Sequence, residues 1–334
     1  MDKEITKICS LFFDGAPNAA HPIDTSRGEA DFRMTFIVET EPNGRYVLKL
    51  ADNDFTFPEK IAVWQRTAEE YRRLGYYCPG IFRDRSGSFP IVDFSGHKCT
   101  AYAEEYSPFR SAEDRFSDDF GKNAVLYDSY KQDIWKMTAR IAAQHFSYTD
   151  YPSAYCLFDT FCPSDRTDEV LENALAWKEY ADTLPGGFRE RAGRIWQLWK
   201  DNRTALEKVY GKLPTSVFQA DLNASNILLD DEGRFAGIFD FNLCGRDVFL
   251  NYLMRENDDV PDICEALSIS AGYYRFSDLE KDTALMLYRC LKPLWYTQVK
   301  KLKEAGNDRD SIDACLGEAE HRLTAPINFR EHMG

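Results

Sequence analysis

The stretch from residue 216 to 242 constrains the fold of this 334-residue chain more than any other part. Within it, two short apolar runs at 227–229 and 234–239 flank the acidic segment 230–233, which ends in glycine. Gly233 can take the positive φ that a tight turn requires. The pattern therefore predicts two short strands that pair as an antiparallel hairpin.

This hairpin would bring together three polar side chains that are separated along the stretch. Asn226 precedes the first strand, Asp240 follows the second, and Asp221 stands on the loop just before them. Antiparallel pairing makes the two ends of a hairpin neighbours, so one amide oxygen and two carboxylates would converge. Such a set of oxygen atoms suits a hard divalent cation beside a general base.

The spacing resembles that of the protein-kinase-like superfamily, and in particular its aminoglycoside phosphotransferase and choline kinase branch. In these proteins a catalytic-loop Asp is followed five residues later by Asn, and then by a metal loop that contains Asp. The chain has Asp221, Asn226 and Asp240-Phe241 at the matching positions. It departs from the family's leading His-Gly by having Gln219-Ala220. Because glutamine both donates and accepts hydrogen bonds, Gln219 could brace the loop as the family's His does.

The resemblance implies roles in phosphoryl transfer, a reaction that needs an aligned acceptor and neutralised phosphate charge. Asp221 would accept the proton of a substrate hydroxyl, and Asn226 and Asp240 would hold Mg²⁺. The implied phosphoryl donor is ATP or GTP, and the implied acceptor is a small molecule that carries a hydroxyl group. The resemblance thus implies a small-molecule kinase.

Upstream of the hairpin, β-rich segments at 32–40 and 45–50 are joined by a turn and predict a second antiparallel pair. Lys49 lies near the end of the second segment. The resemblance assigns this lysine to the α- and β-phosphates of the nucleotide. The segment before the pair contains Ser26 and Gly28 but no glycine-rich motif, and it would take the place of the phosphate-covering loop.

Two further nucleotide-site features follow from the resemblance. Pro58 begins an amphipathic helix that ends near residue 75, and a kinase-like lobe takes from this helix an acid that holds the lysine. Glu69 and Glu70 are both candidates, and we favour Glu69. The strand predicted at 100–106 would lead into the hinge that binds the base, so the segment from Glu104 to Tyr106 would line the purine.

The expected fold is α+β and two-lobed, as in the protein kinases. An antiparallel β-sheet with one helix would form a nucleotide-binding lobe at 1–106, and a larger, mainly α-helical lobe at 107–334 would carry catalysis and substrate binding. A long loop at 148–168 interrupts the helical pattern. Helices are predicted at 126–145, 168–184, 187–210, within 261–305, and at 308–322.

Composition limits the partners and the compartment. The 41 Lys and Arg residues against 55 Asp and Glu give a net charge of −14, which opposes binding to nucleic acids and anionic membranes and favours a cationic substrate. No apolar run approaches the roughly 20 residues of a membrane helix, and the first residues show no secretory signal. Nine cysteines without a Cys-x-x-Cys pair indicate reduced thiols, and thus a cytoplasmic protein.

The sequence leaves the phosphoryl acceptor open, as it does the oligomeric state. An amine-bearing acceptor would use acids such as those at 256–262 and Glu265, whereas a quaternary ammonium would use aromatic faces. The aromatic candidates are Tyr273, Tyr274, Trp295 and Tyr296.

Two alternatives to a small-molecule kinase remain. One is a protein kinase with a macromolecular substrate, which the lack of an Ala-Pro-Glu segment after Asp240 opposes. The other is a catalytically silent nucleotide-binding protein, which would be expected to lack at least one of the four key residues. All four are present: Lys49, Asp221, Asn226 and Asp240.

Overall fold

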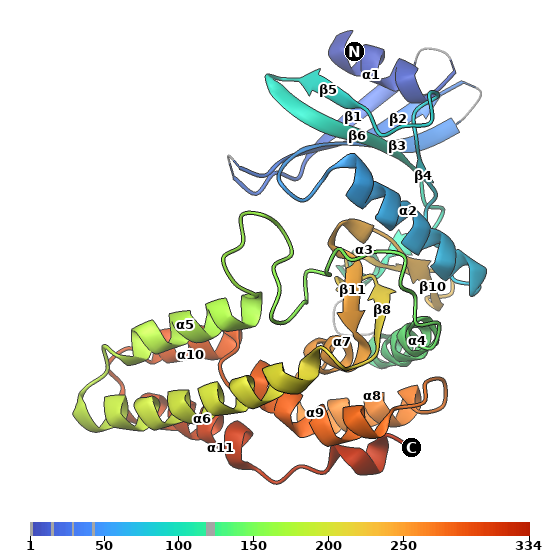
Figure 1. Ribbon diagram of the computed structural model, residues 1–334. Helices are drawn as coiled ribbons and strands as arrows, with labels where there is room; N and C mark the ends of the chain where they lie inside the picture. The colour runs from blue at the N-terminus through green and yellow to red at the C-terminus, as the bar shows by residue number, and fades with distance from the viewer. Residues whose placement is uncertain (1–2, 15–16, 29, 42–43, 118–123) are drawn as a thin grey trace.

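The computed structural model describes residues 3–14, 17–28, 30–41, 44–117 and 124–334. It confirms the predicted α+β class, with an antiparallel sheet in the N-terminal region and a larger helical part after it (Figure 1). The elements of the N-terminal region are α1 (Lys3–Phe12), β1 (Ala19–Asp24), β2 (Phe32–Thr40), β3 (Gly44–Asp52), α2 (Pro58–Arg73), β4 (Ile81–Phe82), β5 (Ile91–Phe94) and β6 (His97–Glu105).

The N-terminal sheet has the strand order β1-β2-β3-β6-β4, and β5 also pairs with β6. All of these neighbours are antiparallel, and the pairing of β2 with β3 confirms the hairpin predicted at 32–50. Lys49 on β3 lies opposite Tyr102 on β6. Helix α1 is an addition to the single helix expected here, and it packs Ile5 and Ile8 against the sheet.

The C-terminal part is built around the predicted hairpin, since β9 pairs antiparallel with β10. β7 pairs with the other edge of β9, and β11 pairs with β8. The elements are β7 (Arg110–Ser111), α3 (Ala112–Ser117), α4 (Ala124–Ala142), α5 (Glu169–Ala181), α6 (Gly186–Tyr210), β8 (Thr215–Phe218), β9 (Ile227–Leu229), β10 (Phe235–Ile238), η1 (Phe241–Leu243), β11 (Gly245–Val248), α7 (Phe249–Glu256), α8 (Val260–Ser270), α9 (Asp278–Leu291), α10 (Tyr296–Ala305), α11 (Arg309–Thr324) and η2 (Phe329–His332).

The long loop between α4 and α5 reaches from the helical part to the N-terminal region (Figure 1). The Lys60 ammonium of α2 donates to the Phe161 carbonyl at 3.1 Å and lies 3.4 Å from the centre of its ring. The Ser164 amide donates to the Asp54 carboxylate at 2.7 Å. The loop therefore ties the two parts together beside the start of α2.

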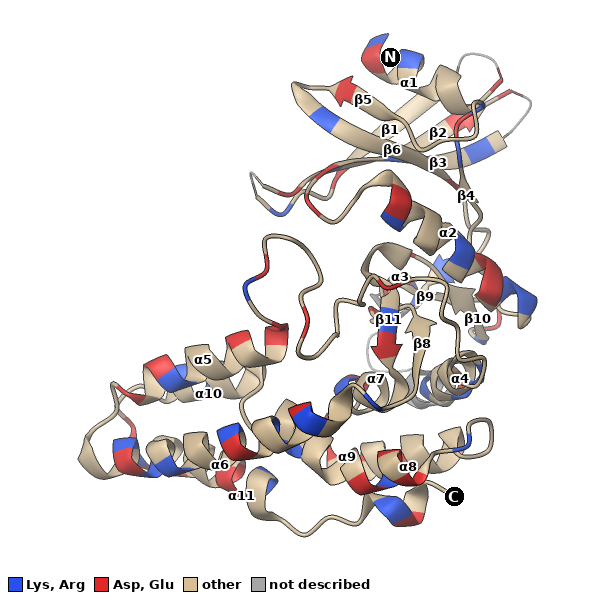
Figure 2. Ribbon diagram, viewed as in Figure 1, with Lys and Arg blue, Asp and Glu red and all other residues tan. Residues whose placement is uncertain are grey.

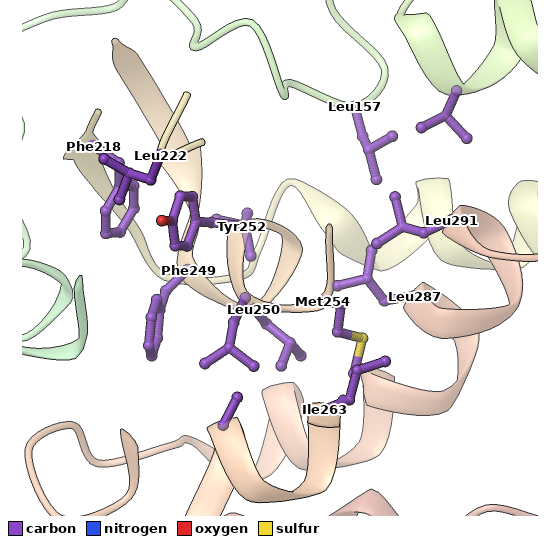
Figure 3. Close-up of a cluster of buried hydrophobic side chains, with 14 of the residues drawn as sticks. Leu157, Phe218, Leu222, Phe249, Leu250, Tyr252, Met254, Ile263, Leu287 and Leu291 are labelled. Atoms are coloured by element: carbon purple, nitrogen blue, oxygen red, sulfur yellow. The ribbon is translucent and has the colours of Figure 1, made fainter. Parts of the chain in front are cut away.

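Two hydrophobic clusters make up the core. The smaller one lies between α1 and one face of the N-terminal sheet. The larger one runs from Tyr102 on the sheet through Ile61 and Trp64 of α2 into the helical part. Figure 3 shows the helical end of this cluster, where Met254 of α7 lies beside Ile263 of α8. Helix α2 thus shares its core with the C-terminal part.

Charged residues lie mostly on the outer surfaces. Figure 2 shows Asp and Glu interspersed with Lys and Arg along α5 and α6. Among the residues that the structure describes, no helix is both long and apolar enough to cross a membrane.

Gly237 on β10 is a position where the fold requires glycine. A Cβ atom there would lie 1.8 Å from the Tyr77 carbonyl oxygen, which accepts the Ile238 amide at 3.0 Å. We expect Gly237→Ala to lower the free energy of unfolding by about 2 kcal/mol or more, because backbone on both sides must shift. Urea denaturation measures this change. Gly193→Ala, with open space around it in α6, is the control and should be neutral or stabilising.

Candidate active site

The hairpin holds Asp221 and Asn226 in a fixed relation. The Asn226 side-chain amide donates to the Asp221 carbonyl at 2.9 Å, and the Phe239 amide donates to the Asn226 carbonyl at 3.0 Å. The Asn223 amide donates to the Asp221 carboxylate at 2.7 Å. These bonds join the loop after β8 to the end of β10, so Asp221, Asn226 and Asp240 lie at one end of the hairpin as predicted.

Asp240 has a left-handed backbone, with φ of 60°. Gln219 braces this turn, since its side-chain amide donates to the Phe239 carbonyl at 3.0 Å and also to the Asp240 carbonyl. Gln219 is itself fully buried, and its backbone N–H donates to the Tyr71 hydroxyl at 3.2 Å. The glutamine therefore does structurally what was expected of it in place of histidine.

We expect Gln219→Leu to reduce kcat about tenfold, because the partly buried Phe239 and Asp240 carbonyls lose their donor and the Asp240 turn loosens. Gln219→His should keep kcat within a few-fold of wild type, since an imidazole N–H can replace one of the two bonds. Steady-state kinetics and a thermal unfolding curve of each variant measure the effect. Equal loss in both variants would contradict a bracing role.

Lys49 bridges the sheet and the hairpin. Its ammonium lies 2.9 Å from an Asp240 carboxylate oxygen and 3.1 Å from a Glu104 carboxylate oxygen. Burial alone would lower the pKa of Lys49, but the Asp240 and Glu104 carboxylates together hold this pKa well above its ordinary value. Lys49 is therefore a fixed cation at the junction of the two parts.

The acid predicted from α2 is not the partner of Lys49. Glu69 is exposed, and Glu70 lies 2.7 Å from Arg73 on the same helix. The inner face of α2 presents Trp64, whose ring packs edge-on against Tyr102 at 5.8 Å between ring centres. Glu69 was therefore a wrong assignment, because helix phase turns it to solvent and an aromatic ring fills the space beside the lysine.

A cavity of about 610 Å³ lies between the sheet and the hairpin. The cavity is lined by Lys49, Glu104, Tyr106 and Asp240. Residues of the segment that follows β6 also line it. Ser26 and Gly28 do not line it, whereas their neighbour Arg27 does. Other residues that line the cavity include Arg33, Tyr102, Ser225 and Asn242.

The phosphate-covering segment is held by its own hydrogen bonds. The Ser26 hydroxyl accepts the Arg33 amide at 3.0 Å, and the Arg27 amide donates to the Asp31 carbonyl at 3.0 Å. Gly28 has φ of 118°, so it permits the turn that places Arg27 at the cavity. Ser26 and Gly28 thus shape the segment, and sequence reasoning missed Arg27 because a single arginine in a turn carries no motif.

Asp221 is half-buried, and its surroundings favour proton uptake. Burial raises the pKa of its carboxyl group, the Asp240 carboxylate adds to this rise, and Asn223 and Arg27 oppose it. Glu256 at the end of α7 interacts with Asp221, and burial raises the pKa of Glu256 to about 7, with the Asp221 carboxylate adding to the rise. Glu256 is hydrogen-bonded to the Tyr155 hydroxyl, from the loop between α4 and α5. From the sequence, Glu256 was only one of several acids that could bind an amine-bearing acceptor.

The other acids of the predicted cluster do not converge on Asp221. Asp259 caps the N-terminus of α8, Asp262 lies 2.6 Å from the Lys131 ammonium, and Glu265 accepts from Gln132 at 3.0 Å. Only Glu256 of this group, among the described residues, interacts with Asp221. The prediction of an acidic cluster thus reduces to one side chain.

The predicted aromatic cage is not assembled. Tyr273 and Tyr296 are exposed, and the buried Tyr274 donates its hydroxyl to Glu280 at 2.9 Å. Trp295 contacts the guanidinium of Arg255, which lies 4.9 Å from its ring and 4.6 Å from that of Tyr155. The Arg255 guanidinium therefore already contacts the Tyr155 and Trp295 rings, which a ligand ammonium would otherwise need.

The oxygen atoms at the hairpin end suit magnesium. Across the described residues, no group of three or more His, Cys, Asp or Glu side chains is placed to hold a metal. Asp240 and Asn226 would therefore supply two protein ligands, and phosphate oxygens and water would complete the octahedron that Mg²⁺ prefers. The Asn226 side-chain N–H donates to the Asp221 carbonyl, and the amide oxygen, which accepts from the Ser225 hydroxyl at 3.4 Å, is the atom that could bind a cation.

The architecture and the placement of these residues define a protein-kinase-like fold. The amicoumacin kinase hAmiN, solved with AMP-PNP and Ca²⁺, is similar over 99% of this chain and 97% of its own, with 13% identity and a TM-score of 0.51. APH(2″)-IIa, solved with streptomycin and ATP, covers 97% and 98%, with 16% identity and a TM-score of 0.47. An ethanolamine kinase from Plasmodium vivax covers 94% and 84%, with 12% identity and a TM-score of 0.42.

The sequence matches the phosphotransferase enzyme family over residues 25–250, and the chain belongs to that family. The predicted enzyme class, a phosphotransferase with an alcohol group as acceptor, is thereby confirmed. A search of curated proteins found no match.

Proposed function

We propose that the protein is a small-molecule kinase that transfers the γ-phosphate of ATP to a hydroxyl group of a small substrate. The observation that carries this proposal is the meeting of Lys49 from the sheet with Asp240 from the hairpin, at 2.9 Å, where both side chains line one cavity. A cation for phosphates and a metal ligand then face one space, and Asp221, which does not line the cavity, interacts with Asp240 at its edge of the hairpin. The lobes would divide near residue 106, just after β6.

Each residue has one task in the proposed transfer. Lys49 binds the α- and β-phosphates, and Tyr106 and the segment after β6 border the space for the purine. Asp221 accepts the hydrogen bond of the acceptor hydroxyl and takes its proton as the new oxygen–phosphorus bond forms. Asp240 and Asn226 hold Mg²⁺, which neutralises charge on the β- and γ-phosphates when bound.

The acceptor would bind near Glu256, because Glu256 interacts with the assigned base Asp221. Above its pKa of about 7, Glu256 is a carboxylate that would favour an acceptor with an amine or several hydroxyl groups, in keeping with the net charge of −14. The nine cysteines are all free thiols in the structure, which supports a cytoplasmic location.

Nucleotide consumption tests the proposal. Purified protein with Mg²⁺ and ATP, and separately GTP, is screened against sugars, amino alcohols, nucleosides and aminoglycosides, and nucleoside diphosphate release and acceptor phosphate are both measured. We expect phosphate on one acceptor class with ATP. Nucleotide binding without transfer to any class would favour the silent alternative, and transfer only to protein substrates would favour a protein kinase.

Arg27 should assist nucleotide binding. It lines the cavity and makes no ion pair with the described residues, so its charge is available to phosphate. We expect Arg27→Gln to raise KM for ATP about five- to tenfold through loss of a charge-assisted hydrogen bond. Lys7→Gln on α1, outside the cavity, is the charge-matched control and should leave KM unchanged. An unaltered KM in the Arg27 variant would remove this role.

A further inference from the structure

We infer that Glu104 on β6 is the positioning residue for the nucleotide lysine, in the place where a kinase fold ordinarily uses an acid from the helix. This inference rests on the proposed function, because it concerns the site that would bind the nucleotide. It changes the role first expected of Glu104 from lining the purine to holding Lys49.

The sheet register places Glu104 beside Lys49. Lys49 faces Tyr102 across the ladder between β3 and β6, and Glu104 is two residues further along β6. Residues two apart on a strand lie on the same face, so Lys49, Tyr102 and Glu104 all face the cavity. The resulting ion pair measures 3.1 Å, and only 7% of the Glu104 side chain is exposed.

The burial of Glu104 shows why the pair would be maintained. Burial raises the pKa of the Glu104 carboxyl, and the Lys49 ammonium opposes that rise. A buried carboxylate without its cation would be costly, so the two groups hold each other in place. Lys49 also forms an ion pair with a second acid, Asp240, at 2.9 Å, so the charges of Lys49, Glu104 and Asp240 lie close together.

Helix α2 cannot supply this acid in the arrangement seen. The buried side chains of its inner face include Trp64, Thr67 and Lys60, and the Lys60 ammonium is already bonded to Phe161. Glu70 is turned toward Arg73. The lysine and its acid therefore lie on adjacent strands of one sheet, and their geometry is set by strand pairing and not by the position of the helix.

The proposed role also fits a change of partners on nucleotide binding. Asp240 would have to accept Mg²⁺ while Lys49 turns to phosphate, so the pair between Lys49 and Asp240 would loosen. Glu104 lies on the sheet and is no metal ligand in the proposed site. It would keep the lysine in the cavity through this exchange.

A double-mutant cycle tests the inference on the full chain. The variants are Glu104→Gln, Lys49→Gln and the pair, with Glu69→Gln and Glu70→Gln as matched controls on α2. We expect Glu104→Gln to raise the Kd for AMP-PNP with Mg²⁺, and KM for ATP, about tenfold, as for loss of a hydrogen bond to a charged group. The double variant should be no weaker than Lys49→Gln alone, Glu104→Asp should recover part of the loss, and the controls should stay within twofold.

Other outcomes separate the possible failures. Additive losses in the double variant, or a tenfold loss from Glu69→Gln or Glu70→Gln, would overturn the inference. A fall in melting temperature with an unchanged Kd in Glu104→Gln would show a purely structural role and would also overturn it. If the folded wild type neither binds AMP-PNP nor consumes ATP, the proposed function itself fails.

Discussion

Replacing Asp221 by Asn is expected to lower kcat by about 10³ while leaving nucleotide binding nearly unchanged, since the variant loses only the proton acceptor. The asparagine oxygen can still accept the Asn223 amide, which now lies 2.7 Å from the carboxylate. The loop should therefore keep its shape. Single-turnover transfer and the Kd for AMP-PNP, measured on the same preparation, separate chemistry from binding.

The pH profile adds a second readout for Asp221. Burial and the nearby Asp240 raise the pKa of Asp221, and the base must be unprotonated to act. Wild-type kcat should therefore rise with pH, with its acid limb above the range of an ordinary aspartate. Asp231→Asn, on the exposed turn of the same hairpin, is the control and should match wild type. Retained kcat in Asp221→Asn would remove the assigned base.

Asp240→Asn is expected to reduce kcat/KM by about 10², because the metal loses its anionic ligand and Lys49 loses one of its two acids. Asparagine tolerates the left-handed backbone with φ of 60°, so we expect the variant to keep the turn. The Mg²⁺ concentration for half-maximal activity should rise in parallel. Titration of AMP-PNP binding against Mg²⁺ measures this shift.

A control separates the two effects of the Asp240 change. Asn242→Ala removes the neighbouring amide, which lies 3.4 Å from Asp240, without altering charge at the site. We expect this variant to show a much smaller change in Mg²⁺ dependence. If Asp240→Asn bound Mg²⁺ and nucleotide as wild type does, Asp240 would not be a metal ligand.

The residues of the hairpin could be predicted because local sequence determines them. Turn chemistry at 230–233 and two short apolar runs specify antiparallel pairing, and that pairing brings Asn226 and Asp240 together. Lys49 could be placed for the same reason, since its hairpin partner strand is adjacent in sequence. Strong local patterns therefore account for the fold class and the center of the site.

The features of the fold and site that the sequence did not predict depend on contacts between segments that are distant along the chain. The pairing of β6 with β3, separated by α2, decides that Glu104 and not Glu69 meets Lys49. Strand β1 was not predicted because Ala-Ala-His-Pro-Ile-Asp has mostly exposed side chains and no apolar alternation. The contact of Glu256 with Tyr155 depends on the path of the long loop between α4 and α5. The sequence of this loop has no hydrophobic periodicity from which its path could be predicted.

The placement of α2 in the core of the helical part has a consequence for folding. Ile61 and Trp64 pack in the same cluster as Phe249 and Met254, so neither lobe can unfold without exposing apolar surface of the other. Melting should therefore be cooperative across the proposed lobe boundary near residue 106. A nucleotide held between the lobes would stabilise the whole chain, by about 2.7 kcal/mol at a concentration 100 times its Kd. Thermal stability thus becomes a simple reporter of which nucleotide the cleft accepts.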